Sequence, residues 1–259
     1  MTYTHHHEAM NAPFEIHIAG KEENYARQAA DAIFREIDHI ESTLSRFSEQ
    51  SDLARIKLLE PGQSLKVSRE TMECLLVALW ATRETDGAFD VTLGRGMQDL
   101  ILDPDALSLQ VSGKSGALAI DLGGIGKGYS LDNTAAIVED WGIENALLTA
   151  GPSTALAMGR QDGDAWSVGL HGRPVNLREQ AISASGKDIK GAHVLDPRTG
   201  DPATGHEKAW AICPSAALAD ALSTAFMVMD TASVKAFCES HEGIQGHLLS
   251  RDGAFMSFA

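Results

Sequence analysis

The chain has 259 residues, of which 44% are hydrophobic and 22% are charged. This composition is typical of a folded globular protein and excludes disordered and fibrous chains. Because 36 acidic residues outnumber 21 basic ones, the formal net charge is −15 with histidine neutral. A surface this acidic repels phosphate backbones and anionic lipid, so we expect no nucleic acid as partner and no membrane-surface binding. Small molecules and proteins remain as ligands.

The cysteine pattern and the N-terminal residues indicate neither a disulfide framework nor a membrane protein. The three cysteines, Cys74, Cys213 and Cys238, are an odd number without C-x-x-C spacing, which favours buried thiols. No window approaches the roughly 18 apolar residues of a membrane span, and the N-terminal residues lack the pattern of a signal peptide. We expect a soluble chain, cytoplasmic as given and periplasmic if a leader is missing.

The first third of the chain predicts one strand and two helices. Residues 10–19 alternate apolar and polar side chains, as a half-buried strand does. Over residues 22–47 the apolar residues recur at spacings of three and four, which predicts a helix with one apolar stripe. A second helix is expected from Ser68, a good N-cap, to Gly87. The histidines at 5–7 could chelate a metal, but a flexible terminal tail is the favoured expectation.

The remainder of the chain mixes strands and helices without a regular βα repeat. The elements expected in chain order are a strand at 117–122, a helix after Gly123-Gly124 up to Gly142, a strand at 145–149, short strands as far as Pro202, a helix after Pro214, a shorter helix to about His241, and a hairpin around Asp252-Gly253. This mixture favours an α+β fold over a doubly wound one.

The densest run of glycines lies at 121–129, DLGGIGKGY. The glycines permit close backbone approach, and Lys127 at a helix start can meet an anion there together with the helix dipole. The run is not a P-loop, because Asp121 and Gly128 stand where that motif needs glycine and Ser or Thr, and it lacks G-x-G-x-x-G spacing. From these residues alone, a phosphate site and a structural turn with a solvated lysine both stay open.

Three further places carry side chains suited to chemistry. Asp220 and Thr224 are four residues apart on a predicted helix, so they share a face and can offer two oxygens to a cation such as Mg²⁺, or form a plain helix hydrogen bond. His193 opens the turn-rich run HVLDPRTGDP, and Asp90 lies in GAFDVTLG. A functional loop and a structural turn explain either run equally well.

Taken together and in this order, the segments resemble the FAD:protein FMN transferases, the ApbE family of flavin transferases once described as thiamine-biosynthesis lipoproteins. The resemblance covers nearly the whole chain and rests on MNAPF at 10–14, SRFSEQSDLARI at 45–56, GAFDVTLG at 87–94, DLGGIGKGYSLD at 121–132, SASG at 183–186 followed by HVLDPRTGDP at 193–202, and ADALSTAFMVM at 219–229. It implies a single domain over residues 1–259, with an α+β, T-fold-related architecture and a flavin-binding cleft.

The resemblance also implies specific sites. The residues implied to bind FAD are Met10, Phe47, Ala88, Phe89, Asp90, Asp121 and Lys127. Mg²⁺ would be held by the carbonyl of Gly124 and the side chains of Asp220 and Thr224, and His193 would be the catalytic histidine near the reacting pyrophosphate. The implied reaction moves FMN from FAD to a threonine hydroxyl of an acceptor flavoprotein, and AMP leaves.

The sequence departs from the family pattern at three places. Gly151-Pro152-Ser153 stands where the family commonly has Gly-Gly-Asp, Phe47 replaces a tyrosine, and Asn11 replaces a glycine. Two alternative functions stay open beside the transferase: an FAD pyrophosphatase that releases FMN and AMP, and a non-catalytic FAD-binding protein.

Overall fold

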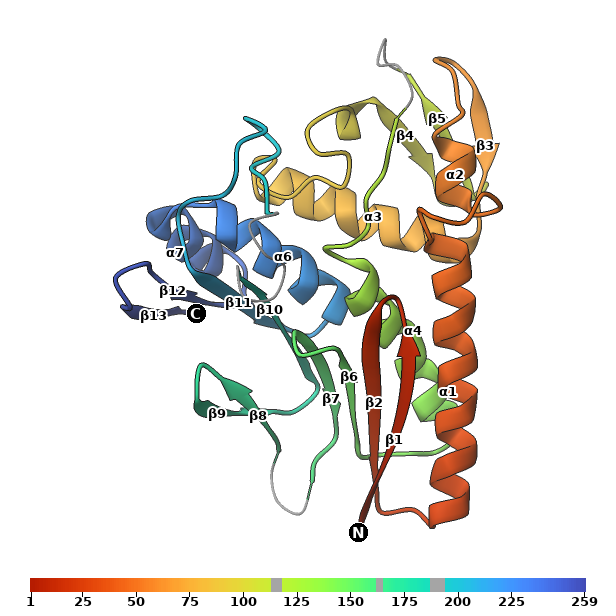
Figure 1. Ribbon diagram of the computed structural model, residues 1–259, viewed down its shortest axis with the longest axis vertical. Helices are drawn as coiled ribbons and strands as arrows, with labels where there is room; N and C mark the ends of the chain where they lie inside the picture. The colour runs from red at the N-terminus through yellow and green to blue at the C-terminus, as the bar shows by residue number, and fades with distance from the viewer. Residues whose placement is uncertain (113–117, 162–164, 187–193) are drawn as a thin grey trace.

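The computed structural model describes residues 1–112, 118–161, 165–186 and 194–259. Its centre is an eight-stranded antiparallel sheet in the order β1-β2-β6-β7-β10-β11-β12-β13 (Figure 1). In that order the strands are Thr2–Ala9, Ala12–Ala19, Ala146–Ala150, Thr154–Met158, Gln180–Gly186, Lys208–Cys213, Gln245–Leu249 and Phe255–Phe258. The two ends of the described chain therefore form the two edges of one sheet.

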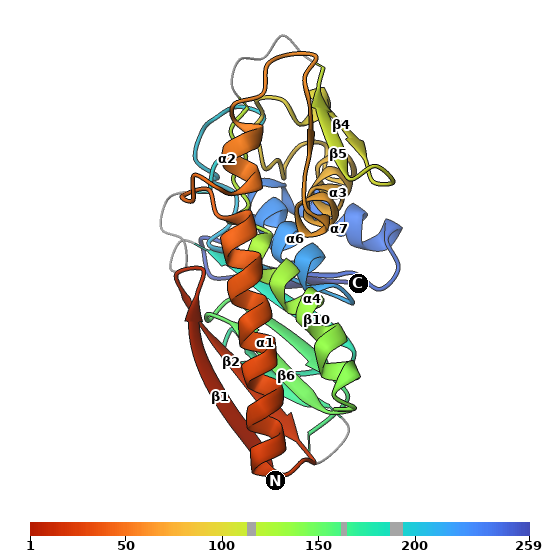
Figure 2. The same ribbon diagram turned by 90° about the vertical axis from the view of Figure 1, so that its right-hand side faces the viewer.

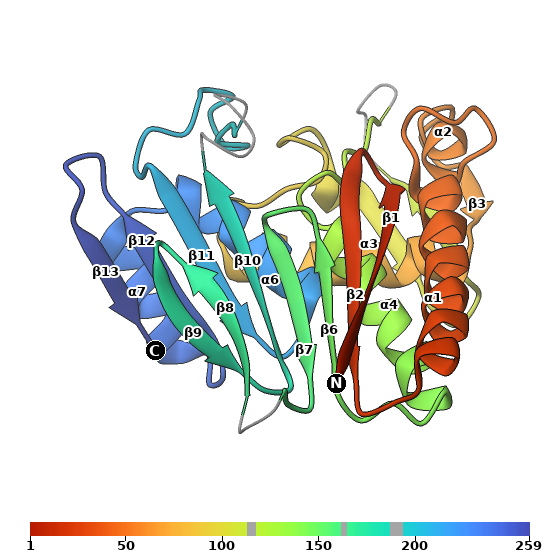
Figure 3. The same ribbon diagram turned by 60° about the horizontal axis from the view of Figure 1, so that its bottom comes forward.

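Helices cover one face of this sheet (Figures 2 and 3). The helices are α1 (Glu23–Leu44), α2 (Asp52–Ile56), α3 (Arg69–Glu84), α4 (Gly126–Asp140), α6 (Ala216–Val228) and α7 (Thr231–Ser240), with a 3₁₀ turn η1 at Met97–Asp99. The central helix α6 packs on β10 and β11 and contacts both α3 and α4. The main hydrophobic core lies between these helices and the sheet.

Two smaller sheets complete the described structure. The hairpin of β8 (Trp166–Leu170) and β9 (Arg173–Leu177) lies on the opposite face of the large sheet, in front of it in Figure 3. A second apolar cluster, which includes Trp166 and Trp210, fills the space beneath this hairpin. The strands β3 (Ser64–Lys66), β5 (Ser108–Val111) and β4 (Leu100–Asp103) form a sheet near α2, beyond the C-terminal end of α1.

The α+β prediction and most of the predicted elements are confirmed. The apolar stripe predicted over residues 22–47 is buried along α1. The hydroxyl of Ser68 accepts a hydrogen bond from Thr71 N–H, as an N-cap does, and the predicted C-terminal hairpin is formed by β12 and β13. All three cysteines are buried and unpaired, and burial raises the pKa of Cys213 to about 12 and of Cys238 to about 11.

Two predictions about local structure are wrong. The segment predicted as a strand at 117–122 is not one from Leu118 to Leu122, although Leu118, Ile120 and Leu122 are buried in alternation. The alternation reflects one-sided burial against the core, and a strand also needs a neighbour to pair with. The histidines at 5–7 do not form a tail, because they lie in β1 and pair with β2, where His6 stands opposite Glu15. No helix within the described ranges is long and apolar enough to cross a membrane.

Candidate functional site

Three segments far apart in sequence meet beside the C-terminal end of α1. They are the tip of the β1–β2 hairpin, the residues after α1, and the start of α4 (Figure 1). Met10 and Asn11 form the hairpin tip with φ of 50° and 56°. Asn tolerates this left-handed conformation better than most residues, and glycine does so best. Met10 N–H donates to the carboxylate of Glu41 at 2.8 Å, which fixes the hairpin tip on α1.

Two cavities open at this meeting point. The first, of about 640 Å³, lies between the hairpin tip, α1 and α4, and is called the hairpin cavity; Met10, Glu41 and Lys127 line it. The second, of about 660 Å³, lies beside α2 and is called the α2 cavity; Lys57 and Leu58 line it. Each volume is within the range of small-molecule sites in proteins.

Arg46, Phe47 and Asp121 line both cavities and so mark the junction between them. The guanidinium of Arg46 forms an ion pair with the carboxylate of Asp121 and lies 4.9 Å from the ring centre of Phe47. Asp121 is itself held, because its Oδ1 accepts a hydrogen bond from Gly123 N–H at 2.9 Å. Phe47 is 83% exposed, so its ring is accessible at the junction.

The start of α4 contributes charge to the hairpin cavity. Lys127 lines the cavity, and its Nζ lies 3.6 Å from Oδ2 of Asp220 on α6. The same Oδ2 accepts a hydrogen bond from Gly128 N–H at 3.3 Å, so the Asp220 carboxylate lies at the N-terminus of α4. A helix N-terminus stabilises negative charge through its free N–H groups. The helix start, the lysine and the carboxylate thus form one electrostatic unit.

The three residues that the family resemblance implies as Mg²⁺ ligands, Gly124, Asp220 and Thr224, lie near one another at the start of α4. A Cβ atom built on Gly124 would lie 3.3 Å from Oγ1 of Thr224, so the backbone at residue 124 approaches that hydroxyl closely. Asp220, one turn before Thr224 on α6, is fully buried, and its Oδ1 accepts a hydrogen bond from the Ser183 hydroxyl at 3.2 Å. A carboxylate, a hydroxyl and a carbonyl are oxygen donors of the kind that Mg²⁺ prefers.

The donor set contains one carboxylate. Within the ranges that the structure describes, no cluster of three or more His, Cys, Asp or Glu side chains could hold a metal ion. A cation beside Asp220 would therefore need water or substrate oxygens to complete its coordination. Mg²⁺ commonly binds in this way, with one or two carboxylates plus substrate phosphates.

The loop at 87–94 packs on the loop that begins at Val194. A Cβ on Gly94 would lie 1.9 Å from the carbonyl oxygen of Pro197, so only glycine permits this contact. Asp196 and Arg198 are joined by two side-chain hydrogen bonds of 2.8 Å, which hold the pKa of Asp196 below its usual range. The sequence singled out both loops, and the structure places them side by side.

The residues Ala88, Phe89 and Asp90 are buried in the first of these loops. Oδ1 of Asp90 accepts hydrogen bonds from Thr92 N–H at 2.7 Å and from the Thr92 hydroxyl at 2.6 Å, which stabilises the turn. The ring of Phe89 lies 3.2 Å from a Cβ built on Gly124. Among the described lining residues of the two cavities none comes from 88–90, so their contact with FAD stays a prediction.

Sequence reasoning missed Arg46 and Ser183 as candidates. Arg46 lies within SRFSEQSDLARI, and Ser183 opens SASG, but neither segment alone tells which distant residue these side chains contact. The structure pairs Arg46 with Asp121 and Ser183 with Asp220. His193 lies outside the described residues, so its catalytic role stays a prediction.

Comparison with known proteins identifies a family for the chain. The ApbE family model matches residues 10–248. The FAD:protein FMN transferase of Vibrio cholerae is 23% identical over 88% of this chain and 81% of its own length, and that of Klebsiella pneumoniae is 24% identical over 94% and 83%.

Solved structures have the same fold. The Thermotoga maritima ApbE protein superposes with a TM-score of 0.86 at 26% identity, covering 100% of this chain and 97% of that one. The apo flavinyl transferase ApbE of Pseudomonas stutzeri gives 0.86 at 23% identity, covering 100% and 95%. Because the family model matches residues 10–248, nearly the full length, the chain belongs to the ApbE family.

Proposed function

We propose that this protein is a Mg²⁺-dependent FAD:protein FMN transferase, which moves FMN from FAD to a threonine hydroxyl of an acceptor flavoprotein and releases AMP. The relatives named above carry the name of this transferase. The observation that carries the proposal is the grouping of Gly124, Lys127, Asp220 and Thr224 at the start of α4, beside the hairpin cavity.

The reaction is a phosphoryl-type transfer. The threonine oxygen forms a bond to the phosphorus of the FMN half, and the bond from that phosphorus to the bridging oxygen breaks. AMP leaves with the bridging oxygen, and the hydroxyl proton is released. In such reactions, positioning of the reactants and neutralisation of the phosphate charge supply most of the rate enhancement.

The charges of the site suit this chemistry. The protein has a formal charge of −15, so an anionic pyrophosphate needs local positive charge in order to bind. Lys127 and the N-terminus of α4 supply part of it. Mg²⁺, when bound by Asp220, Thr224 and the Gly124 carbonyl, would neutralise further phosphate charge.

The remaining predicted residues have supporting parts in this proposal. The exposed ring of Phe47 offers a stacking face for an aromatic ring of FAD, and Met10 lines the same cavity. Asp121 would orient the Arg46 side chain at the junction of the two cavities through their ion pair. Ala88, Phe89 and Asp90 would contact FAD from the adjacent loop, and His193 would act at the reacting phosphate.

We also infer that residues 1–259 form a single flavin transferase domain. The first strand, β1, and the last, β13, belong to the same sheet, and helices from both halves of the chain pack on one face of it. A division into two domains would have to divide this sheet.

The fate of the flavin tests the function. The protein is incubated with FAD and Mg²⁺, with and without an unmodified recombinant domain of a flavoprotein whose mature form carries FMN on a threonine, and the flavins and nucleotides are separated by chromatography. We expect FMN on the acceptor and an equal amount of AMP. Free FMN in place of modified acceptor would indicate a pyrophosphatase, and intact bound FAD a binding protein. Either result would contradict the transferase.

A further inference from the structure

The junction of the two cavities carries a positive charge that the family resemblance does not assign. We propose that Arg46 binds the pyrophosphate of FAD. The proposal rests on the proposed function, because it takes FAD as the ligand. Arg46 lies within a segment that the sequence analysis singled out, but it was not among the residues predicted to bind FAD.

The position of Arg46 follows from the shape of the site. Among the described lining residues, Arg46, Phe47 and Asp121 are shared by the two cavities. A ligand that extends from one cavity into the other would pass these three side chains. FAD consists of two ring systems joined through a pyrophosphate, so the part at the junction is the anionic one.

The guanidinium of Arg46 has hydrogen-bonding capacity to spare. An arginine side chain carries five N–H donors in a rigid fork that matches phosphate oxygens. Within the described part of the chain, Arg46 uses its Nη1 on Asp121 and has no other hydrogen-bonding partner. Its side chain is 53% exposed, so the other donors are accessible to a ligand.

The neighbours of Arg46 hold it ready for an anion. Asp121 anchors one edge of the guanidinium and is fixed by Gly123 N–H, while the ring of Phe47 lies under the cation at 4.9 Å. A side chain held in place before binding loses less conformational entropy when the ligand arrives. The ion pair with Asp121 thus orients the cation without using up its donors.

Charge around the cavities favours this position for the phosphates. Glu41 lines the hairpin cavity and Glu49 the α2 cavity, so each cavity has a carboxylate of its own that repels an anion, whereas the shared carboxylate, Asp121, is paired with Arg46. Of the described cations in the linings, Lys57 belongs to the α2 cavity and Lys127 to the hairpin cavity. Arg46 belongs to both, and with Lys127 it would provide one cation for each phosphate.

Ligand titrations with an Arg46→Gln variant test the proposal. The variant keeps a polar side chain of similar length and loses the charge. We expect its Kd for FAD and for ADP to rise about tenfold, the order of one charge-assisted hydrogen bond to a partly exposed group. Riboflavin, which has no phosphate, should bind both proteins alike. The salt dependence of FAD binding should also be smaller in the variant.

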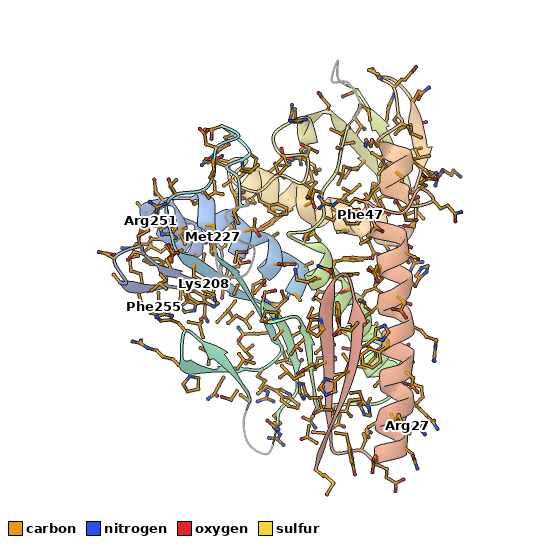
Figure 4. All side chains as sticks on the ribbon, in the orientation of Figure 1. Arg27, Phe47, Lys208, Met227, Arg251 and Phe255 are labelled. Carbon is orange, nitrogen blue, oxygen red and sulfur yellow. The ribbon has the colours of Figure 1, made fainter. Side chains whose placement is uncertain are left out.

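Two further variants serve as controls. Arg46→Lys retains the charge without the fork, so we expect it to recover part of the lost affinity. Arg27→Gln removes an exposed arginine near the N-terminal end of α1, far from Phe47 (Figure 4), and should bind every ligand as the parent does.

The outcomes separate the proposal from its alternatives. Unchanged FAD affinity in Arg46→Gln would overturn it. Equal weakening for FAD and riboflavin would show that Arg46 only maintains the structure. Tighter FAD binding would show that the ion pair obstructs the junction. If the parent protein binds no FAD at all, the proposed function fails first, which is a distinct result.

Discussion

The carboxylate of Asp220 is buried at the point where α4, α6 and β10 meet. It accepts hydrogen bonds from Gly128 N–H and the Ser183 hydroxyl and lies 3.6 Å from Nζ of Lys127. Burying a charge is costly unless partners compensate for it, so this network has to be kept intact in any test. An isosteric substitution is therefore a better probe than a truncation.

Asp220→Asn should raise the Mg²⁺ concentration needed for half-maximal turnover by about tenfold or more, because a neutral amide oxygen is a far weaker ligand for a hard cation than a carboxylate. Thr224→Val should show a milder defect, since a neutral hydroxyl contributes less. Turnover is measured against Mg²⁺ concentration, and circular dichroism checks the fold. A folded Asp220→Asn protein with the parental Mg²⁺ response would exclude the proposed metal site.

Lys127→Ala should weaken FAD binding, and the loss should shrink as salt is raised, because mobile ions screen the charge that the lysine presents to the pyrophosphate. Its side chain is only 17% exposed, so part of the effect should persist at high salt. Titration with FAD at two salt concentrations measures the loss of affinity at low salt and the part of it that persists at high salt. A dissociation constant equal to that of the parent would show that Lys127 does not contact FAD and has only a structural role beside Asp220.

At the residue scale the sequence predicts residue types better than their partners. The spacing of Asp220 and Thr224 correctly places them on one helix, but the full burial of Asp220 depends on contacts with β10 and α4. Arg46 and Asp121 are separated by 75 positions, and no local pattern links them. Such pairs follow only from the tertiary fold.

Among the elements, the crossing of α4 and α6 positions the site most directly. Gly128 lets the two helices approach, because a Cβ there would lie 2.1 Å from the carbonyl oxygen of Ala216. Asp132 on α4 then caps α6, accepting hydrogen bonds from the Ser215 hydroxyl at 2.6 Å and from Ala216 N–H at 2.7 Å. The glycines of the 121–129 run thus serve helix packing as well as the cavity.

Gly128→Ala should destabilise the protein by about 1–3 kcal/mol or more, because the clash is with backbone and cannot be relieved by a side-chain rotation. Gly126→Ala is the matched control: its nearest neighbour would be Leu122 Cβ at 3.8 Å, an ordinary contact. Denaturant unfolding compares the two variants. Equal stability of both would mean that the close crossing is not required.

Elements with strong local signals were predictable, and those defined by distant pairing were not. The stripe of α1 and the N-cap of α3 appear in the sequence and in the structure. β1 carries three consecutive histidines and is a strand because β2 pairs with it through a two-residue turn. Residues 118–122 have the alternation of a strand without a partner strand.

For the whole molecule, the order of strands in the large sheet could not be predicted from sequence. β2 pairs with β6, more than a hundred residues later, and β10 lies between β7 and β11. Composition constrains the overall charge and the presence of a core, but not these connections. The T-fold-related expectation came from the family resemblance, and the match to ApbE structures confirms an ApbE-like fold.

Histidine burial predicts how the stability of the molecule depends on pH. Burial lowers the pKa of His5, His17, His206 and His247. His206 donates its Nε2–H to the carbonyl of Met229, and its buried Nδ1 has no partner among the described residues, so a second proton there would be poorly solvated. The nearby Asp230 partly offsets this effect.

The sign of the effect follows from proton binding. Because the folded-state pKa values are depressed, the unfolded state binds more protons as pH falls below the ordinary histidine value of 6.5. The contribution of these histidines to the free energy of unfolding is present above that pH. It is lost as the pH falls through their folded-state pKa values. The melting midpoint should therefore drop between about pH 7.5 and about pH 5.5, and drop less in a His206→Gln variant. A midpoint that rises over this interval would contradict the assignment.

The intact mass of an acceptor flavoprotein domain, after incubation with this protein, FAD and Mg²⁺, shows whether FMN has been transferred. We expect a mass increase equal to FMN less one water. The increase should be absent when the acceptor threonine is replaced by valine, and strongly reduced with Asp220→Asn. An acceptor of unchanged mass, while the protein binds FAD and the same acceptor is modified by a relative such as the Vibrio cholerae transferase, would contradict it.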